Sequence, residues 1–315
     1  MSKYKNKPLT PEGLKTYSLR SRKSKVDINT FAQAMSGGES IERFIESLPS
    51  ILAGKDFKQF LLLMKKAREK ERAIIFALGA HVIKVGLNPI IIDLMKKGWI
   101  TALALNGACI IHDFEVAIRG QTSEDVESQL KKGQFGMAKE TGEMLNVAIN
   151  SGAEEGLGLG ESVGRMIADS DFPYKNLSLL ATSYELCIPA TVHVALGTDT
   201  IHLHPESKGE ALGGTSLKDF FLFCSLLEKL EDGGIFINVG SAVIMPEVFL
   251  KAVSFVRNKG ISLEDFTTAA FDIIHHYRPY QNVVRRPVAE KGRGFYFIGH
   301  HEIMIPLLAV ALQSV

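Results

Sequence analysis

Short apolar runs that alternate with helical stretches constrain the fold of this chain most. Four clear runs are AIIFALGA (73–80), ITALALNG (100–107), IPATVHVALG (188–197) and GGIFINVGSAV (233–243), and two weaker ones are DFTTAAFD (265–272) and GFYFIGH (294–300). Continuous apolar strands between helices are typical of parallel sheets with both faces covered. The pattern predicts an α/β fold, namely a Rossmann-like parallel sheet with helices on both faces.

The remaining segments are arranged around these runs. Residues 1–35 are polar and rich in Lys and Ser, so we expect a solvated arm ahead of a single domain over residues 36–315. A mostly helical insertion is expected at about 120–187, between the second and third runs. It contains GLGLGESVG (156–164), which no predicted strand precedes, so we expect a loop that enters a helix and not a dinucleotide fingerprint.

Composition argues against several classes of partner. The formal net charge is +1, which gives no reason to expect nucleic acid. The N-terminus has no apolar signal core and the longest apolar stretches are too short to span a bilayer, so no membrane is expected. The three cysteines make neither a disulfide framework nor a zinc motif, and we expect a reduced, cytoplasmic setting.

Histidines gather where the predicted strands end. Eight of the nine follow a strand run, and His193 lies inside one. Ligands of open α/β sheets bind outside the carboxyl ends of the strands, and imidazole exchanges protons near neutral pH. The set therefore predicts an enzyme site at this edge. For any single histidine, a helix cap or a bond to a backbone carbonyl is the alternative.

Small residues at four strand ends would let backbone amides approach a nucleotide. The four ends are Gly79-Ala80-His81, Asn106-Gly107-Ala108, Gly197-Thr198-Asp199 and Asn238-Val239-Gly240-Ser241. Asp199 could accept hydrogen bonds from ribose hydroxyls or could cap a turn, and both roles stay open.

Two further clusters could bind a ligand. The first is basic, and we expect it to bind carboxylate or phosphate; the alternative is a solvated loop. It consists of Arg278, Arg285, Arg286, Lys291 and Arg293, close to His300, His301 and Glu302. His202 and His204 would point to the same side of an extended segment. No third ligand at a diagnostic spacing accompanies them, so no metal is expected.

From about residue 70 onward the chain resembles the deoxyhypusine synthase family. The resemblance rests on the order of local strings, which are GAHVIKVGL, ALNGACIIHDF, IPATVHVALGTDTIHLHP, INVGSAVIMPEVFLKAV, FTTAAFD and GHHEIMIPLL. It implies a Rossmann-like NAD-binding fold and a homotetramer with active sites between paired subunits. It would place NAD against Ala80, His81, Asn106, Gly107, Asp199, Gly240, Ser241, Thr268, Ala269, His300 and His301.

The departures from the family bear on the substrate. Acidic family positions fall on His112, near His204 and on His300, and the family's Trp-Gly-Lys string is missing, which leaves Lys291 as the nearest lysine. Imidazoles in place of carboxylates remove an attraction for a polycation and favour an anion. We therefore expect an NAD-dependent enzyme that acts on a phosphate- or carboxylate-bearing small molecule by hydride transfer, with or without group transfer, and not a true deoxyhypusine synthase.

The catalytic candidates follow from that expectation. A histidine would act as general base, and the candidates are His112, His202, His204 and His300. Lys291 would form the imine if a covalent step occurs, and Arg278, Arg285, Arg286 and Glu302 would contact the substrate. The alternatives are a polyamine aminobutyl transferase of the homospermidine synthase type, a non-catalytic nucleotide-binding protein and, last, a metal-dependent hydrolase.

Overall fold

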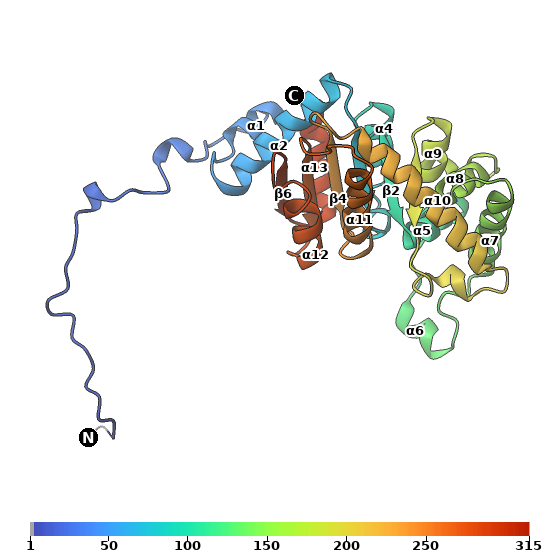
Figure 1. Cartoon of the computed structure of the whole chain (residues 1–315), viewed down its shortest axis with the longest axis horizontal. Coiled ribbons are helices and arrows are strands. Elements are labelled where there is room, and N and C mark those ends of the chain that lie inside the picture. Colours follow the sequence, from blue (N-terminus) through green and yellow to red (C-terminus); the bar gives the residue numbers. More distant parts are fainter. Residues whose placement is uncertain (1–2, 315) are drawn as a thin grey trace.

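The computed structural model describes residues 3–314 and contains a parallel sheet of six strands. They are β1 (Ile74–Leu78), β2 (Ala102–Asn106), β3 (Ala190–His193), β4 (Ile235–Val239), β5 (Thr267–Asp272) and β6 (Arg293–Ile298). Their order is β3-β2-β1-β4-β5-β6, and each neighbouring pair is parallel. Figure 1 shows the sheet among the helices, with β2, β4 and β6 labelled. The six apolar runs of the sequence form these strands, so the predicted fold class is confirmed.

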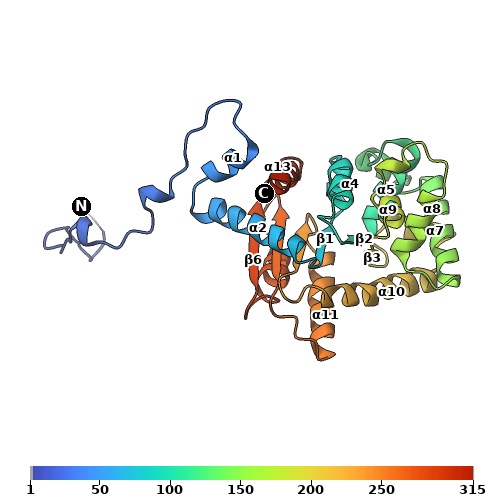
Figure 2. The same cartoon turned by 90° about the horizontal axis from the view of Figure 1, so that it is seen from above.

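Helices cover both faces of the sheet. The helices of the described residues are α1 (Ile41–Ser47), α2 (Leu52–Glu69), α3 (His81–Lys84), α4 (Asn88–Lys96), α5 (Gly107–Arg119), α6 (Val126–Lys131), α7 (Lys139–Glu154), α8 (Leu159–Ala168), α9 (Leu179–Glu185), α10 (Gly209–Glu228), α11 (Ile244–Asn258), α12 (Tyr277–Pro279) and α13 (His301–Ser314). Because side chains alternate along a strand, Phe76 of β1 packs in one core cluster and Ile75 in the other. Figure 2 shows α4 and α13 on one side of the sheet and α10 and α11 on the other.

Side chains of α10 close the β3 edge of the sheet. Oδ2 of Asp219 accepts hydrogen bonds from the backbone N–H groups of Val192 (2.7 Å) and Gly160 (2.8 Å). Oγ of Ser216 donates to the carbonyl of Val192 (2.9 Å) and accepts from the N–H of Val194 (3.1 Å). An edge strand would otherwise expose these backbone groups. Helix α10 thus takes the place of a further strand and fixes β3.

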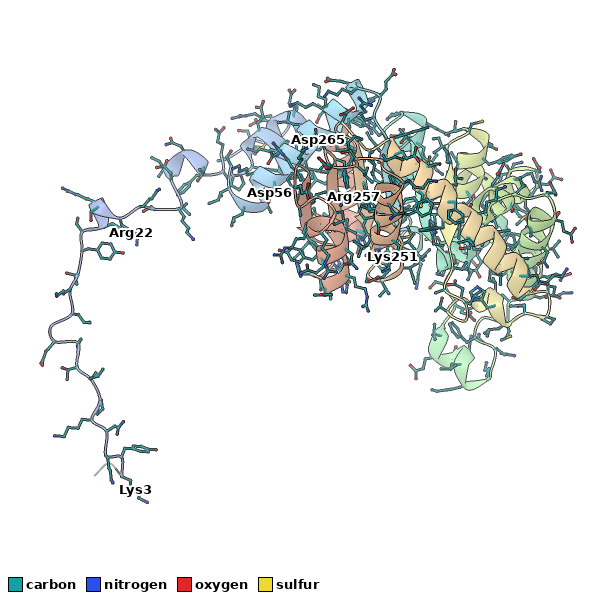
Figure 3. All side chains as sticks on the ribbon, in the orientation of Figure 1. Lys3, Arg22, Asp56, Lys251, Arg257 and Asp265 are labelled. Atoms are coloured by element: carbon teal, nitrogen blue, oxygen red, sulfur yellow. The ribbon has the colours of Figure 1, made fainter. Side chains whose placement is uncertain are left out.

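The N-terminal segment and the region before β3 lie outside the sheet. Residues 3–35 run away from the body with two 3-10 turns, Leu19–Ser21 and Ile28–Thr30, and the side chains of Lys3 and Arg22 project from this segment (Figures 1 and 3). Between α5 and β3 the chain forms α6 to α9, and the GLGLG stretch enters α8 as a loop, as expected. Among the described residues, no helix is long and apolar enough to cross a membrane.

Candidate active site

The strand order reverses between β1 and β4, and the chain is unusually close-packed there. The N–H of Gly79 donates to the carbonyl of Val239 (2.8 Å), and a Cβ atom added at Gly79 would overlap the carbonyl oxygen of Gly240. Gly240 has φ +67°, a left-handed conformation that favours glycine. In doubly wound sheets the ligand crevice forms at this reversal. The two glycines therefore mark the centre of the candidate site.

Two histidines flank this reversal. The ring centroids of His81 and His301 are 5.3 Å apart, and His301 lies against Gly240. Nε2 of His301 lies 3.2 Å from the carbonyl of Phe271, which can only accept, so Nε2 carries the proton and Nδ1 is an acceptor. That Nδ1 is buried with no hydrogen-bond partner among the described residues. Burial lowers the pKa of His301, so the ring is held neutral and can accept a bond from a ligand.

A second pair of unpartnered groups lies at the start of α5. The side chain of Asn106 accepts from the N–H of Cys109 (3.3 Å) and caps the helix. Next to it, the carboxylate of Asp199 packs onto Gly107, where any Cβ would overlap it. Oδ2 of Asp199 and Nε2 of His202 are both buried without a hydrogen-bond partner among the described residues, 3.9 Å apart.

The charge states of this pair follow from its surroundings. Nδ1 of His202 accepts from the N–H of Gly197 (3.0 Å), so Nε2 carries the proton. Burial raises the pKa of Asp199 to about 6 against a hydrogen bond from Thr198, and burial lowers the pKa of His202. An acceptor and a donor therefore face the same small space at a helix N-terminus, which suits a ligand hydroxyl.

His112 opens onto a cavity beside this pair. The cavity has a volume of about 210 Å³, and its lining includes Lys84 of α3, His112 and Glu115 of α5, Glu124, and Asp199. Nδ1 of His112 is hydrogen-bonded to Oγ1 of Thr122 (2.7 Å). The cavity brings one imidazole and one lysine to the carboxyl ends of β2 and β3.

The ends of β5 and β6 contribute groups that the sequence analysis missed. Asp272 is buried, its Oδ1 lies 3.8 Å from Nε2 of His276, and its Oδ2 has no hydrogen-bond partner among the described residues. Both residues were visible in the sequence as a strand-final carboxylate followed by a histidine pair. Exposed apolar side chains lie at or just beyond the carboxyl ends of β4, β5 and β6, and these are Val243, Ile273, Ile274, Tyr277, Ile298 and Ile303.

Some predicted residues do reach the carboxyl edge without forming a shared cluster. His300 is exposed and lies 3.8 Å from Glu302, in the first turn of α13. Oγ of Ser241 accepts from the N–H of Met245 (3.1 Å) in the first turn of α11, and half-buried Ala80 precedes α3. His204 instead packs on Gly142 of α7 and donates from Nε2 to the carbonyl of Gly136 (2.8 Å), which ties α7 and the loop before it to the segment that follows β3.

Other predicted residues lie away from that edge. Lys291 precedes the first residue of β6, at the amino edge of the sheet, and forms an ion pair with Glu264. The π-helical turn Tyr280–Arg285 runs back beside the start of β5, where Oγ1 of Thr268 donates to the carbonyl of Val283 (2.9 Å). Arg285 is the last residue of this turn and Arg286 follows it, so both lie away from the carboxyl edge. Arg278 pairs with Glu247 at the start of α11 (3.3 Å).

Thr268 and Ala269 correct the placement that the family resemblance implied. They are the second and third residues of β5, toward its amino end, and so lie away from the carboxyl ends of the strands. The basic cluster is likewise divided between the two edges, because the chain crosses the sheet between Arg278 and Lys291. Within residues 3–314 no three histidine, cysteine or acidic side chains gather as a metal site.

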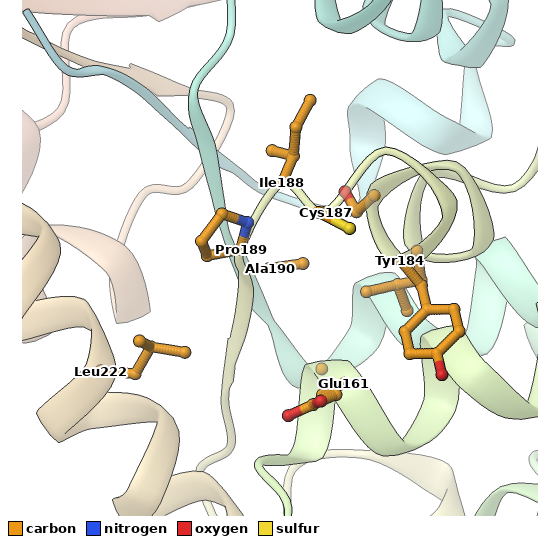
Figure 4. A pocket seen from close by; sticks show the side chains of 10 residues that line it. Glu161, Tyr184, Cys187, Ile188, Pro189, Ala190 and Leu222 are labelled. Atoms are coloured by element: carbon orange, nitrogen blue, oxygen red, sulfur yellow. The ribbon is translucent and has the colours of Figure 1, made fainter.

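A further cavity lies at the opposite edge of the sheet. It has a volume of about 290 Å³ at the amino end of β3, between α8, α9 and α10 (Figure 4). Its lining is mostly apolar, with Tyr184, Ile188 and Leu222 around Glu161. It holds none of the strand-end histidines, so the chemistry points to the carboxyl edge.

Comparisons with known proteins show the fold. No family model and no curated protein sequence matches the chain. Among solved structures, the apo arginine dihydrolase ArgZ from cyanobacteria superposes with a TM-score of 0.52 at 15% identity, covering 84% of this chain and 33% of ArgZ. AgrE in complex with ornithine and NAD⁺ gives 0.50 at 16% identity, covering 89% of this chain and 34% of AgrE. This chain thus spans about a third of the length of these two proteins.

A third structure matches over almost its whole length. A putative deoxyhypusine synthase from Entamoeba histolytica superposes with a TM-score of 0.51 at 12% identity, covering 90% of this chain and 96% of that one. The chain therefore has a deoxyhypusine synthase-like fold, as the local strings of the sequence indicated.

Proposed function

We propose that this chain is an NAD-dependent enzyme that binds the dinucleotide along the carboxyl edge of β1 to β4. The observation that carries the proposal is the close approach of Gly79 and Gly240 where the strand order reverses. The similarly folded AgrE has been solved with NAD⁺, which supports it. The contacts would come from Ala80, His81, Asn106, Gly107, Asp199, Gly240, Ser241 and His301.

The residues present fit such a ligand. Gly79 and Gly240 let the ends of β1 and β4 approach closely where the strand order reverses, and two buried acceptors, Nδ1 of His301 and Oδ2 of Asp199, lack partners among the described residues. A dinucleotide supplies amide and hydroxyl donors for both, and the N-terminus of α5 favours its phosphates. Bound NAD⁺ would accept a hydride from the substrate.

The substrate would be a small molecule with a carboxylate or phosphate group. Lys84 is the cation that lines the cavity beside His112, so it would hold the anionic group, and His112 would act as the general base. The arginines contribute less than the sequence suggested, since only Arg278 lies near this edge and it is paired with Glu247.

The affinity for NAD⁺ is expected to rise with pH through about 6. Burial raises the pKa of Asp199 to about 6, and only the ionised carboxylate is a pure acceptor for a ligand hydroxyl. Affinity should be weak below this pH and reach its plateau above it, about tenfold higher. Isothermal titration calorimetry from pH 5 to 8 measures this. The Asp199→Asn variant should bind weakly with a flat profile, and an unchanged slope would remove Asp199 from the site.

We also propose a homotetramer with active sites between paired subunits. The exposed apolar side chains around the ends of β4 to β6 support it, since a patch of this kind beside a site marks an interaction surface. Ile303→Asp in the first turn of α13 should break the assembly. Light scattering should give four chains for the wild type and for Ile28→Asp, a control in the arm, but fewer for Ile303→Asp. A monomeric wild type would contradict the proposal.

A further inference from the structure

A chain of hydrogen bonds joins a carboxylate to the imidazole that faces the cavity. Oγ1 of Thr122 donates to Oε2 of Glu115 (2.5 Å), and Nδ1 of His112 lies 2.7 Å from the same Oγ1. The hydroxyl of Thr141 donates to the other oxygen of Glu115 (3.2 Å). Thr141 lies in α7 and Glu115 in α5, so these hydrogen bonds also connect the two helices.

The direction of these bonds determines the tautomer of His112. A carboxylate can only accept, so the Thr122 hydroxyl donates its hydrogen bond to Glu115. Its oxygen must then accept a hydrogen bond from the imidazole. Nδ1 therefore carries the proton, and Nε2 keeps a lone pair. Among the described residues Nε2 has no hydrogen-bond partner, and His112 lines the cavity together with Lys84. The side chain is 16% exposed, so Nε2 can be reached by a ligand.

We propose that Thr122 and Glu115 are positioning residues that hold His112 as a base through Nε2, and that an anionic substrate group bound at Lys84 switches this base on. The proposal rests on the proposed function for the identity of the reaction. It assigns a role to Thr122, Glu115 and Lys84, none of which the sequence analysis selected.

The charges around His112 explain the switch. Burial and then the positive charge of Lys84 lower the pKa of His112 to about 4, so the empty site holds a weak base. The other charged groups lining the cavity are Glu115, Glu124 and Asp199. Glu124 accepts a hydrogen bond from the N–H of Gly136 (2.8 Å), and Glu115 accepts the two threonine hydroxyls. An anion beside Lys84 would cancel its repulsion and raise the pKa of His112 toward its ordinary value.

The base would then remove a proton from the group being oxidised. The O–H or N–H proton of the substrate would go to Nε2 of His112, and NAD⁺, when bound, would accept the hydride with its electron pair from the adjacent carbon. The substrate loses two hydrogens and two electrons, and the polarised Thr122 hydroxyl stabilises the imidazolium that forms. In the unoccupied site, the weak base would leave water and stray ligands with their protons and therefore unreactive.

Nitrogen NMR of the full chain labelled at its histidine rings tests the relay without knowledge of the substrate. The signals of the His112 ring are identified by their loss in the His112→Gln variant. We expect them to show a neutral ring that is protonated at Nδ1. The Thr122→Val variant should lose the preference for this tautomer, and Thr122→Ser should keep it. Ser123 is a neighbouring cavity residue, and Ser123→Ala should leave the tautomer unchanged. If Thr122→Val fails to fold, Glu115→Gln replaces it. Protonation of His112 at Nε2 in the wild type would overturn the relay.

A titration with sulfate, used as a plain anion at constant ionic strength, tests the switch. The pKa of His112 should rise by about one pH unit in the wild type and in Lys139→Met, a matched surface control, but not in Lys84→Met. Lys84→Met alone should already raise it in the absence of sulfate. Equal behaviour of Lys84→Met and the wild type would overturn the role of Lys84. These readouts need no NAD, so failure of NAD binding would count against the proposed function and not against the relay.

Discussion

Replacing Asp113 with alanine is expected to lower the free energy of unfolding by about 4 kcal/mol. Asp113 of α5 is fully buried, and its Oδ1 accepts from the N–H of Leu179 (2.8 Å) and from Asn88 (3.2 Å). Its Oδ2 accepts from the hydroxyl of Ser178 (2.6 Å) and the N–H of Leu180 (3.0 Å). Truncation leaves these donors buried without a partner, and it removes the anion at the start of α9.

Urea denaturation followed by circular dichroism measures this loss. Asp171→Ala, an exposed aspartate ahead of α9, is the matched control and should lie within about 0.5 kcal/mol of the wild type. An Asp113→Ala variant within 1 kcal/mol of the wild type would show that these donors find other partners and that α5 and α9 do not depend on this carboxylate.

Replacing Gly79 with alanine is expected to lower the affinity for NAD⁺ about 100-fold. The added Cβ overlaps the carbonyl oxygen of Gly240, which is backbone and cannot swing away, so the ends of β1 and β4 must separate. That separation disturbs the crevice at the reversal of strand order. The cost in stability is about 3 kcal/mol, typical of overpacking.

Calorimetric titration of folded Gly79→Ala with NAD⁺ measures the affinity, and thermal unfolding measures the stability. Gly213→Ala provides the control, because this glycine lies in α10 with nothing within 4 Å of an added Cβ. The control should bind normally and gain up to about 1 kcal/mol of stability, since alanine is the better helix former. Normal NAD⁺ binding by Gly79→Ala would place the dinucleotide elsewhere.

The sheet could be predicted from the sequence because its evidence is local. Each strand is a short apolar run bounded by glycine or polar residues, and the carboxyl end of each parallel strand falls on the same edge. His81, Asn106 and Asp199 reach that edge for this reason. Asp272 and His276 were visible by the same criterion, although no role was assigned to them.

The rest of the site depends on contacts between distant segments. Lys291 and His300 are nine residues apart in sequence, but β6 lies between them and carries them to opposite edges of the sheet. Thr268 was predicted to contact NAD because the FTTAAFD string resembles a family motif. In the structure its hydroxyl bonds to the turn at Val283 instead. The partners of His112 could not be inferred either, since Thr122 lies beyond the end of α5 and folds back onto it.

The identity of any small molecule that leaves the freshly purified protein tests the central claim most directly. Intact-complex mass spectrometry, followed by denaturation and analysis of the released ligand, should find NAD on the wild type, and the same protein stripped of ligand should take up added NAD⁺ at one per chain. Gly79→Ala should carry little or none. A protein that is purified without a ligand and does not bind added NAD⁺ would contradict the account. The close approach of Gly79 and Gly240 where the strand order reverses would then serve another ligand.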